Sequence, residues 1–113
     1  MIELKAIIQS FQLNEVIEAL QRIEGLPGVT VSDVRGFGRA RAADARDKIV
    51  DGSIAYARKS KLEIVIPESL LDTVRETILE KAHTGNPGDG KIFVSEVIDV
   101  VRIRTRERGE EAI

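Results

Sequence analysis

Residues 84–94 read Thr-Gly-Asn-Pro-Gly-Asp-Gly-Lys-Ile-Phe-Val, a glycine-rich turn that runs directly into a strand-like segment. Glycine adopts backbone conformations that other residues avoid, and a turn of this kind exposes successive N–H groups that can bind an anion. Lys91 adds a point charge that suits a phosphate. The stretch therefore indicates a polyphosphate site, and the alternative is an ordinary Gly/Pro hairpin turn with a solvated lysine.

The tail of the chain carries an arginine at every second position, namely Arg102, Arg104, Arg106 and Arg108. If this segment is a strand, its period of two points all four side chains to one face. Four like charges on one face favour a bound anion, although charges on a solvated edge strand also discourage aggregation. Together with the glycine-rich turn, the tail favours a polyphosphate ligand.

Length and composition limit the classes of protein that the chain can belong to. It has 113 residues, 42% hydrophobic and 32% charged, with a formal net charge of −2 and no cysteine. We expect one domain, 1–113, no general nucleic-acid binding, and neither disulfides nor thiolate metal sites. No apolar run is long enough to span a membrane, and residues 1–9 lack a signal-peptide pattern, which predicts a cytoplasmic protein without membrane insertion.

Hydrophobic periodicity predicts strands at 2–9, 29–39, 61–66 and 91–98, and helices at 13–24 and 68–82. The spacing of the valines in the second strand indicates a bulge near Asp33. The order β-α-β, long loop, β-α-β is that of the ferredoxin-like fold, an α+β arrangement with an antiparallel sheet and two helices on one face. The other face would remain uncovered, and self-association is the simplest way to bury it.

Residues 40–58, between the two halves, are rich in alanine and charge and show little apolar periodicity. A loop of this length in a small domain is usually functional or disordered. We interpret it as an arm that binds a partner protein, and the alternative is an excursion without a function.

Over nearly its whole length the chain resembles the PII signal-transduction family, the nitrogen regulatory proteins. Residues 84–94 are similar to the family's B-loop signature, with the loop itself at about 84–91. Gly-Phe-Gly-Arg at 36–39 resembles the start of its T-loop, at about 40–58, and 102–113 resembles its C-loop and tail. The resemblance implies a homotrimer that binds ATP or ADP in clefts between subunits and signals to a target protein without being an enzyme.

The resemblance also implies which residues hold the nucleotide. The adenine would lie near Thr30 and Val65, and Glu63 corresponds to a family carboxylate close to Lys91. The phosphates would meet a group of glycines, amides and cations, with the last two arginines coming from the neighbouring subunit: Gly36, Gly38, Arg39, Gly88, Asp89, Gly90, Lys91, Arg102 and Arg104.

The T-loop departs from the family pattern at two positions. Ala40 stands where nitrogen-sensing members have a glutamine that helps to hold Mg²⁺ and 2-oxoglutarate, although Lys59 matches the family lysine that meets 2-oxoglutarate. Gly52 stands where a tyrosine is uridylylated, and Tyr56 is expected to pack at the loop base. The resemblance therefore implies a retained nucleotide site and a changed target.

Several features of this signalling role stay open at the level of sequence. The target would be a membrane transporter or a metabolic enzyme, the nucleotide ATP, ADP or AMP, and the second effector 2-oxoglutarate or bicarbonate. A slow ATPase is the enzymatic alternative, because His83 precedes the phosphate turn and is suited either to general base catalysis or to a favourable position at a helix C-terminus.

Overall fold

The computed structural model describes the backbone of residues 1–38, 48–51 and 54–113, and the side chains of 1–38 and 55–113. Two short 3₁₀ turns, Ser10–Gln12 and Glu68–Leu70, lead into the two helices, and a third, η3, spans Gly109–Ala112. The remaining elements follow one another in this order: β1 (Ile2–Gln9), α1 (Leu13–Gln21), β2 (Thr30–Gly36), β3 (Lys48–Asp51), β4 (Ile54–Ile66), α2 (Leu71–Ala82) and β5 (Gly90–Glu96).

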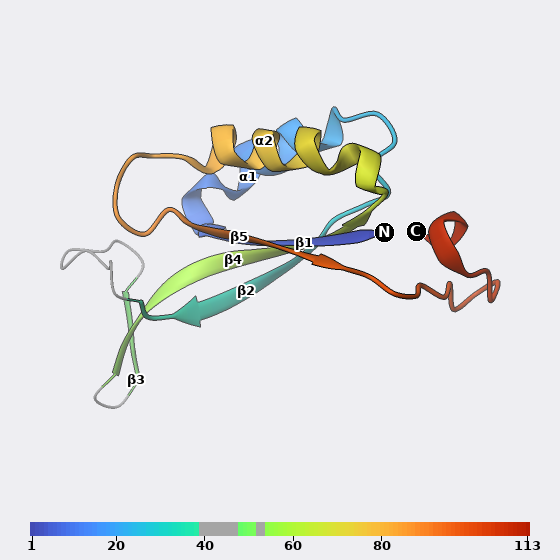
Figure 1. Cartoon of the computed structure of the whole chain (residues 1–113). Helices are drawn as coiled ribbons and strands as arrows, with labels where there is room; N and C mark the ends of the chain where they lie inside the picture. The colour runs from blue at the N-terminus through green and yellow to red at the C-terminus, as the bar shows by residue number, and fades with distance from the viewer. Residues whose placement is uncertain (39–47, 52–53) are drawn as a thin grey trace.

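The strands form one antiparallel sheet in the order β2-β4-β1-β5, and β3 pairs with the distal part of β4. Both helices lie on the same face of this sheet (Figure 1). The β-α-β, β-α-β order, the strand order and the two-layer arrangement confirm the predicted ferredoxin-like fold.

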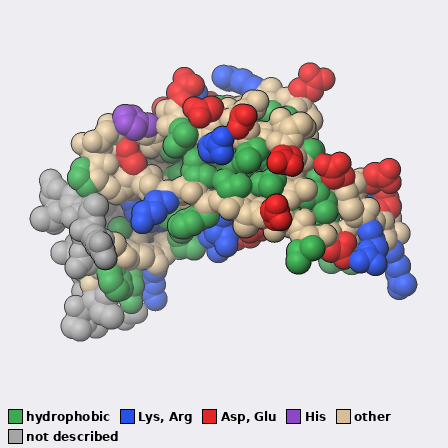
Figure 2. Space-filling model, viewed as in Figure 1, with side chains coloured by type: hydrophobic (Ala, Val, Ile, Leu, Met, Phe, Trp, Pro, Cys, Tyr) green, Lys and Arg blue, Asp and Glu red, His purple; other side chains and the backbone are tan. Residues whose placement is uncertain are grey.

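The hydrophobic core lies between the sheet and the helices, and β1 shows how the sequence specifies it. Its residues alternate strictly between buried and half-buried, because successive side chains of a strand point to opposite faces. The core is aliphatic and combines the inward sides of β1, β4, α1 and α2: Ile2, Leu4, Ala6, Ile8, Leu62, Ile64, Ile66, Val16, Leu20, Val74 and Ile78. Figure 2 shows hydrophobic side chains in a band between the helical layer and the sheet.

The opposite face of the sheet carries polar and charged side chains among a few apolar ones. Cross-strand pairing places these side chains in rows, of which two are Thr30–Glu63–Lys5–Phe93 and Ser32–Lys61–Ile7–Lys91. Within the described residues no helix covers this face, and the Phe93 side chain is 51% exposed. The prediction of an uncovered face is therefore confirmed for the described part of the chain.

Two predictions on the β2 and loop regions were wrong. No bulge occurs near Asp33, which pairs with Ser60 in an unbroken register from Thr30 to Gly36. The segment 40–58 is also not a loop throughout, because β3 and the first residues of β4 form a hairpin in which Lys48 pairs with Ala57. The β-branched residues at 49, 50 and 54 favour such a pairing. The rest of the segment, at 40–47 and 52–53, lies outside the described residues.

The predicted arginine strand is wrong as well. Strand β5 ends at Glu96, and the chain then turns back so that Val101 bridges Arg108. Arg106, with a φ of 64°, lies in the turn, where the Arg106 N–H donates to the Arg102 carbonyl over 2.7 Å. The four arginines do not form one row, because the chain reverses direction between them. Acidic residues pair with two of them: Arg102 with Glu107 at 3.3 Å and Arg108 with Asp99 at 2.6 Å.

Candidate functional site

The glycine-rich turn between α2 and β5 requires glycine at three positions. Gly85, Gly88 and Gly90 have φ values of 88°, 99° and 98°, in the left-handed region that other residues rarely adopt. At Gly90 the constraint is also steric, because a Cβ there would lie 1.7 Å from the Ile7 carbonyl oxygen of β1. The glycines thus allow the turn to pack directly against the neighbouring strand.

The Asp89 carboxylate organises this turn from within. It accepts hydrogen bonds from the Thr84 N–H at 2.8 Å, the Gly85 N–H at 2.9 Å and the Gln9 amide at 3.1 Å, and from the Thr84 hydroxyl. Burial alone would raise the pKa of Asp89, but these hydrogen bonds outweigh it and lower the pKa from 3.8 to about 2. Asp89 is therefore a charged acceptor that connects both ends of the turn to β1.

Two lysines from different strands lie at this turn, and they differ in their hydrogen bonding to the described residues. The Lys59 ammonium group, on β4, donates a hydrogen bond to the Gly88 carbonyl. Lys91, the second residue of β5, is exposed and makes no hydrogen bond or ion pair with the described residues. Lys91 is thus available to an anion at the turn, whereas Lys59 ties the turn to the strand that leads out of the T-loop.

Thr30 and Val65, the two residues predicted to lie near the base, come together at a different place, and Glu63, which was predicted close to Lys91, lies with them. Thr30 pairs with Glu63 across β2 and β4, and Val65 follows two residues later on the same face. They line a concave space of about 290 Å³, which we call the base pocket, together with Glu3, Pro27, Gly28 and Ile113. The Glu63 carboxylate forms an ion pair with Lys61 at 3.1 Å.

Within one chain, the turn and the base pocket are separated. Lys91 lies on β5 and Thr30 on β2, which are the two edges of the strand order β2-β4-β1-β5. Three strand spacings of about 4.8 Å place these edges about 14 Å apart. Gly36 pairs with Ala57 at the distal end of β2, with Gly38 just beyond, and Arg39 lies outside the described residues.

The two tail arginines that were predicted to meet phosphates are held differently. Arg102 pairs with Glu107 and also donates to the Glu111 carbonyl at 3.3 Å. Arg104 is exposed and has no hydrogen-bond or ion-pair partner among the described residues. The structure therefore places Arg102 within the fold of the tail and leaves Arg104 accessible.

The base of the T-loop is marked by an aromatic contact. The rings of Phe37 and Tyr56 lie 6.1 Å apart, centroid to centroid, and the Arg35 guanidinium lies 5.3 Å from the Tyr56 centroid. The predicted packing of Tyr56 at the loop base is confirmed by these contacts. His83 occupies the C-cap position of α2, as the capping interpretation predicted, and it is exposed.

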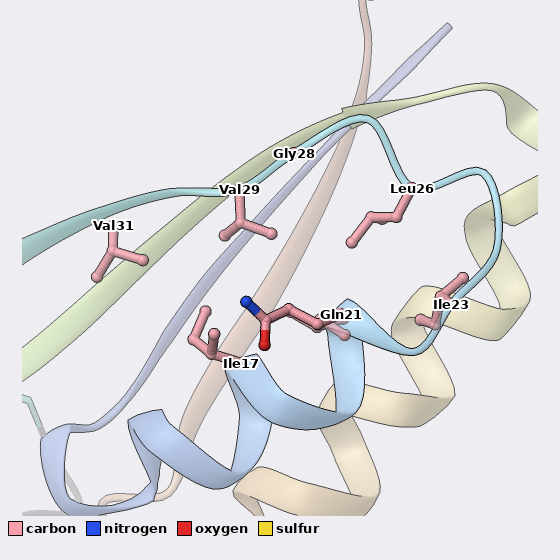
Figure 3. A pocket seen from close by; sticks show the side chains of 8 residues that line it. Ile17, Gln21, Ile23, Leu26, Gly28, Val29 and Val31 are labelled. Atoms are coloured by element: carbon pink, nitrogen blue, oxygen red, sulfur yellow. The ribbon is translucent and has the colours of Figure 1, made fainter.

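A second cavity, between α1 and β2, is unrelated to the predicted nucleotide residues. It encloses about 390 Å³, and no charged side chain is among its lining residues: Ile17, Leu20, Gln21, Ile23, Leu26, Gly28, Val29 and Val31. Figure 3 shows Ile17 and Gln21 facing Val29 from the helix side. It is an apolar recess at the edge of the core.

Sequence reasoning missed several residues that the structure brings to the two sites. Gln9 reaches Asp89 across 80 residues of sequence, and no local pattern reveals such a contact. Thr84 belongs to the quoted turn, and its spacing of five from Asp89 was the only signal for its role. Glu3, Pro27 and Ile113 join the base pocket from three separate segments, which only the folded topology could show.

Comparisons with known proteins agree with this fold. The model of the family "Nitrogen regulatory protein P-II" matches residues 1–107. The chain is 43% identical over 111 residues to a nitrogen regulatory protein P-II of Azospirillum brasilense and 42% identical to P-II 1 of Escherichia coli K12, in each case covering 98% of both chains. A crystal structure of Arabidopsis thaliana PII bound to citrate superposes with a TM-score of 0.78 at 43% identity, covering 99% of this chain and 91% of that one.

No described helix has both the length and the apolar character that a membrane crossing demands. The match over residues 1–107, the identity over almost the full length and the shared ferredoxin-like fold lead to one assignment. The chain belongs to the nitrogen regulatory protein P-II family of signal-transduction proteins.

Proposed function

We propose that the chain is a single-domain, trimeric sensor that binds ATP or ADP between subunits and regulates a target protein through its T-loop. The observation that carries this proposal is the division of one chain into two half-sites. A glycine-rich turn with an available lysine lies on one edge of the sheet, and the base pocket lies on the other.

The turn supplies what a polyphosphate needs. Glycines at 85, 88 and 90 keep side chains away from the backbone, so that phosphate oxygens can approach the amides. Lys91 supplies a positive charge beside them and is free of ion pairs with the described residues. The internal bonds of Asp89 hold the turn in shape before a ligand arrives, which lowers the entropic cost of binding.

The base pocket supplies a different chemistry. Val65 and Pro27 offer apolar surface to a flat ring, and the Thr30 hydroxyl and the Glu63 carboxylate offer acceptors for an exocyclic amine. This combination suits adenine, and it accounts for ATP, ADP or AMP as ligand. The number of phosphates that the site prefers depends on the cations that meet them. Among these cations we include Arg102, Arg104 and Arg39, which follows Gly36 and Gly38 in the sequence.

A ring of three copies joins the two half-sites. In a closed ring each interface brings one patch of a subunit against a different patch of the next. The glycine-rich turn near the β5 edge and the base pocket near the β2 edge are such a pair of patches. Association also offers cover for the polar sheet face and for Phe93.

Among the residues that the structure describes, no set of side chains fits Mg²⁺. Ala40 has no side-chain oxygen, and the Asp89 carboxylate already accepts four hydrogen bonds. Among the described residues no group of three His, Asp or Glu side chains could hold a metal. We therefore assign no role to Mg²⁺ beyond its association with the nucleotide phosphates in solution.

The hydrogen bond between Lys59 and the glycine-rich turn favours a second candidate for the effector. Its ammonium group donates to the Gly88 carbonyl, so 2-oxoglutarate would have to compete with the turn for this lysine. With Ala40 in place of the family glutamine, half of the 2-oxoglutarate site is absent. A sensor of adenine nucleotides that responds to bicarbonate, or to no second effector, is the alternative within the same family.

We infer that the output is protein binding in the cytoplasm. The T-loop, about 40–58, differs from the nitrogen-sensing pattern, so the target is a membrane transporter or a metabolic enzyme outside the usual set. A slow ATPase is the less favoured activity, because His83 is exposed at the C-cap of α2, the position that the capping interpretation predicted.

Calorimetric titration tests the proposal. The wild-type protein is titrated with ATP, ADP and AMP, each with and without 2-oxoglutarate and bicarbonate. We expect adenine-nucleotide binding that is indifferent to 2-oxoglutarate. Binding of ATP that 2-oxoglutarate strengthens would identify a nitrogen sensor of the usual kind, and absence of binding by all three nucleotides would refute the proposal.

A further inference from the structure

The tail of the chain contributes to the base pocket. Ile113 is one of its lining residues, although 48 residues of sequence separate it from Val65. Figure 1 shows the C-terminus of the chain beside the N-terminus, next to the start of β1, where Glu3 lies in the same pocket. The pocket therefore has a wall that the sheet itself does not provide.

This wall is held in place by hydrogen bonds. The Gly109 N–H donates to the Val100 carbonyl at 3.0 Å, which anchors η3 to the segment after β5. The Arg102 guanidinium donates to the Glu111 carbonyl at 3.3 Å, and the Ile113 N–H donates to Glu110 at 3.3 Å. Ala112 is only 8% exposed. These contacts hold η3 in place, so that Ile113 lies at the base pocket.

The chemistry of the wall complements that of the sheet side. Among the lining residues, Thr30, Glu3 and Glu63 carry side-chain oxygen atoms, whereas the side chain of Ile113 is aliphatic. A flat aromatic ring needs acceptors at its edge and apolar atoms over its face. Ile113 is suited to the second task, and it shares that task with Val65 and Pro27.

We propose that Ile113 covers the bound base and is a specificity-determining residue of the nucleotide site. The inference rests on the proposed function, since it concerns the same site. It predicts that the side chain of Ile113 contributes to the affinity for the base and not to the affinity for the phosphates.

The test compares Ile113→Ala, Ile113→Val and wild type, with Leu79→Ala as matched control. Leu79 is half-exposed on α2, in the helical layer, so its variant loses a similar aliphatic group away from the pocket. The Kd for ATP is measured by calorimetry, and the Kd for inorganic tripolyphosphate by displacement of ATP. Thermal unfolding and light scattering of each variant report on folding and on oligomeric state.

Ile113→Ala is expected to raise the Kd for ATP by about three- to tenfold, because the substitution removes aliphatic surface that contacts the ring. Ile113→Val and Leu79→Ala should stay within about twofold of wild type, and the tripolyphosphate constant should not change. Unchanged ATP binding in Ile113→Ala, or equal weakening of ATP and tripolyphosphate, would overturn the inference while leaving the proposed function intact.

Two further outcomes are also decisive. If wild type itself fails to bind ATP, the proposed function is wrong and the role of Ile113 falls with it. If Ile113→Ala does not fold, Ile113→Val decides alone: a small loss for ATP with none for tripolyphosphate supports the role, and equal losses overturn it.

Discussion

At the scale of single residues, the Asp89 carboxylate holds together a turn that contains three left-handed glycines. The family resemblance implied a role for its backbone amide at the phosphates, and the structure shows that its side chain also holds Thr84, Gly85 and Gln9 together. A carboxylate that accepts several hydrogen bonds is stabilised in its charged form, which lowers its pKa. The residue thus links the shape of the turn to its own ionisation.

Acid should therefore loosen the turn. The folded pKa of Asp89, about 2, lies below the ordinary 3.8, so its stabilising effect is complete above about pH 4 and is lost as the pH falls through about 2. Asp89→Asn should cost about 1 kcal/mol of unfolding free energy at pH 7, because a charged acceptor becomes neutral.

The measurement is thermal unfolding of wild type and Asp89→Asn from pH 7 to pH 2. We expect the gap between their midpoints to shrink between pH 4 and pH 2, where wild type loses its charge at this position. A gap that stays constant over that range would show that the ionisation of Asp89 does not stabilise the fold.

A substitution at Gly90 tests the close packing of the turn against β1. In Gly90→Ala the added Cβ would meet the Ile7 carbonyl at 1.7 Å, with φ in the left-handed region, so β1 and β5 would have to separate locally. We expect a loss of about 3 kcal/mol or more in urea unfolding. Gly36→Ala is the matched control, since nothing lies within 4 Å of its Cβ position, and it should stay within about 1 kcal/mol of wild type. Similar stability of both variants would contradict the packing described here.

Among the elements, hydrophobic periodicity predicted those strands and helices that have one buried face and one exposed face. Strand β1 was predicted with its observed bounds, because its alternation reports one buried and one open face. The second helix was predicted from 68, and its first three residues form a 3₁₀ turn before α2. The element order followed from these patterns.

The elements that were wrongly predicted depend on pairings that hydrophobic periodicity does not reveal, although the partners are close in sequence. Strand β4 extends back to Ile54 because β3 pairs with it, and a charged, alanine-rich sequence does not reveal that partner. The arginine tail folds back on itself, and there Glu107 and Asp99 pair with two of its arginines. Likewise, the sequence pattern identified the turn and the family resemblance implied Thr30 and Val65, but neither revealed the remaining members of the base pocket.

The T-loop should be separable from the rest of the fold. The pairing of β2 with β4 ends at Gly36 and Ala57, so removal of residues 42–55 leaves that register intact. We expect the deletion variant to keep the trimer, by light scattering, and to keep its Kd for ATP within about threefold. Binding to the target protein, measured by co-purification with the full chain as reference, should be lost. Loss of the trimer on deletion would show that the loop is structural.

At the scale of the whole molecule, one chain cannot complete the site that its parts describe. The turn with Lys91 and the pocket with Thr30 lie on opposite edges of the sheet, and the polar face between them is open in the described part of the chain. In the closed ring that we propose, the β5 edge of one subunit would lie near the β2 edge of the next. We therefore propose that each nucleotide is shared by two copies.

A mixing experiment tests this claim most directly. Lys91→Ala disables the turn, and Thr30→Phe fills the base pocket, so neither variant should bind ATP appreciably as a homotrimer. When the two variants are refolded together, every mixed ring should contain one interface with an intact turn and an intact pocket. We predict that ATP binding returns in the mixture with the affinity of wild type and a reduced number of sites. Failure of the mixed, correctly assembled trimers to bind ATP would contradict the account, since it would place both half-sites within one subunit.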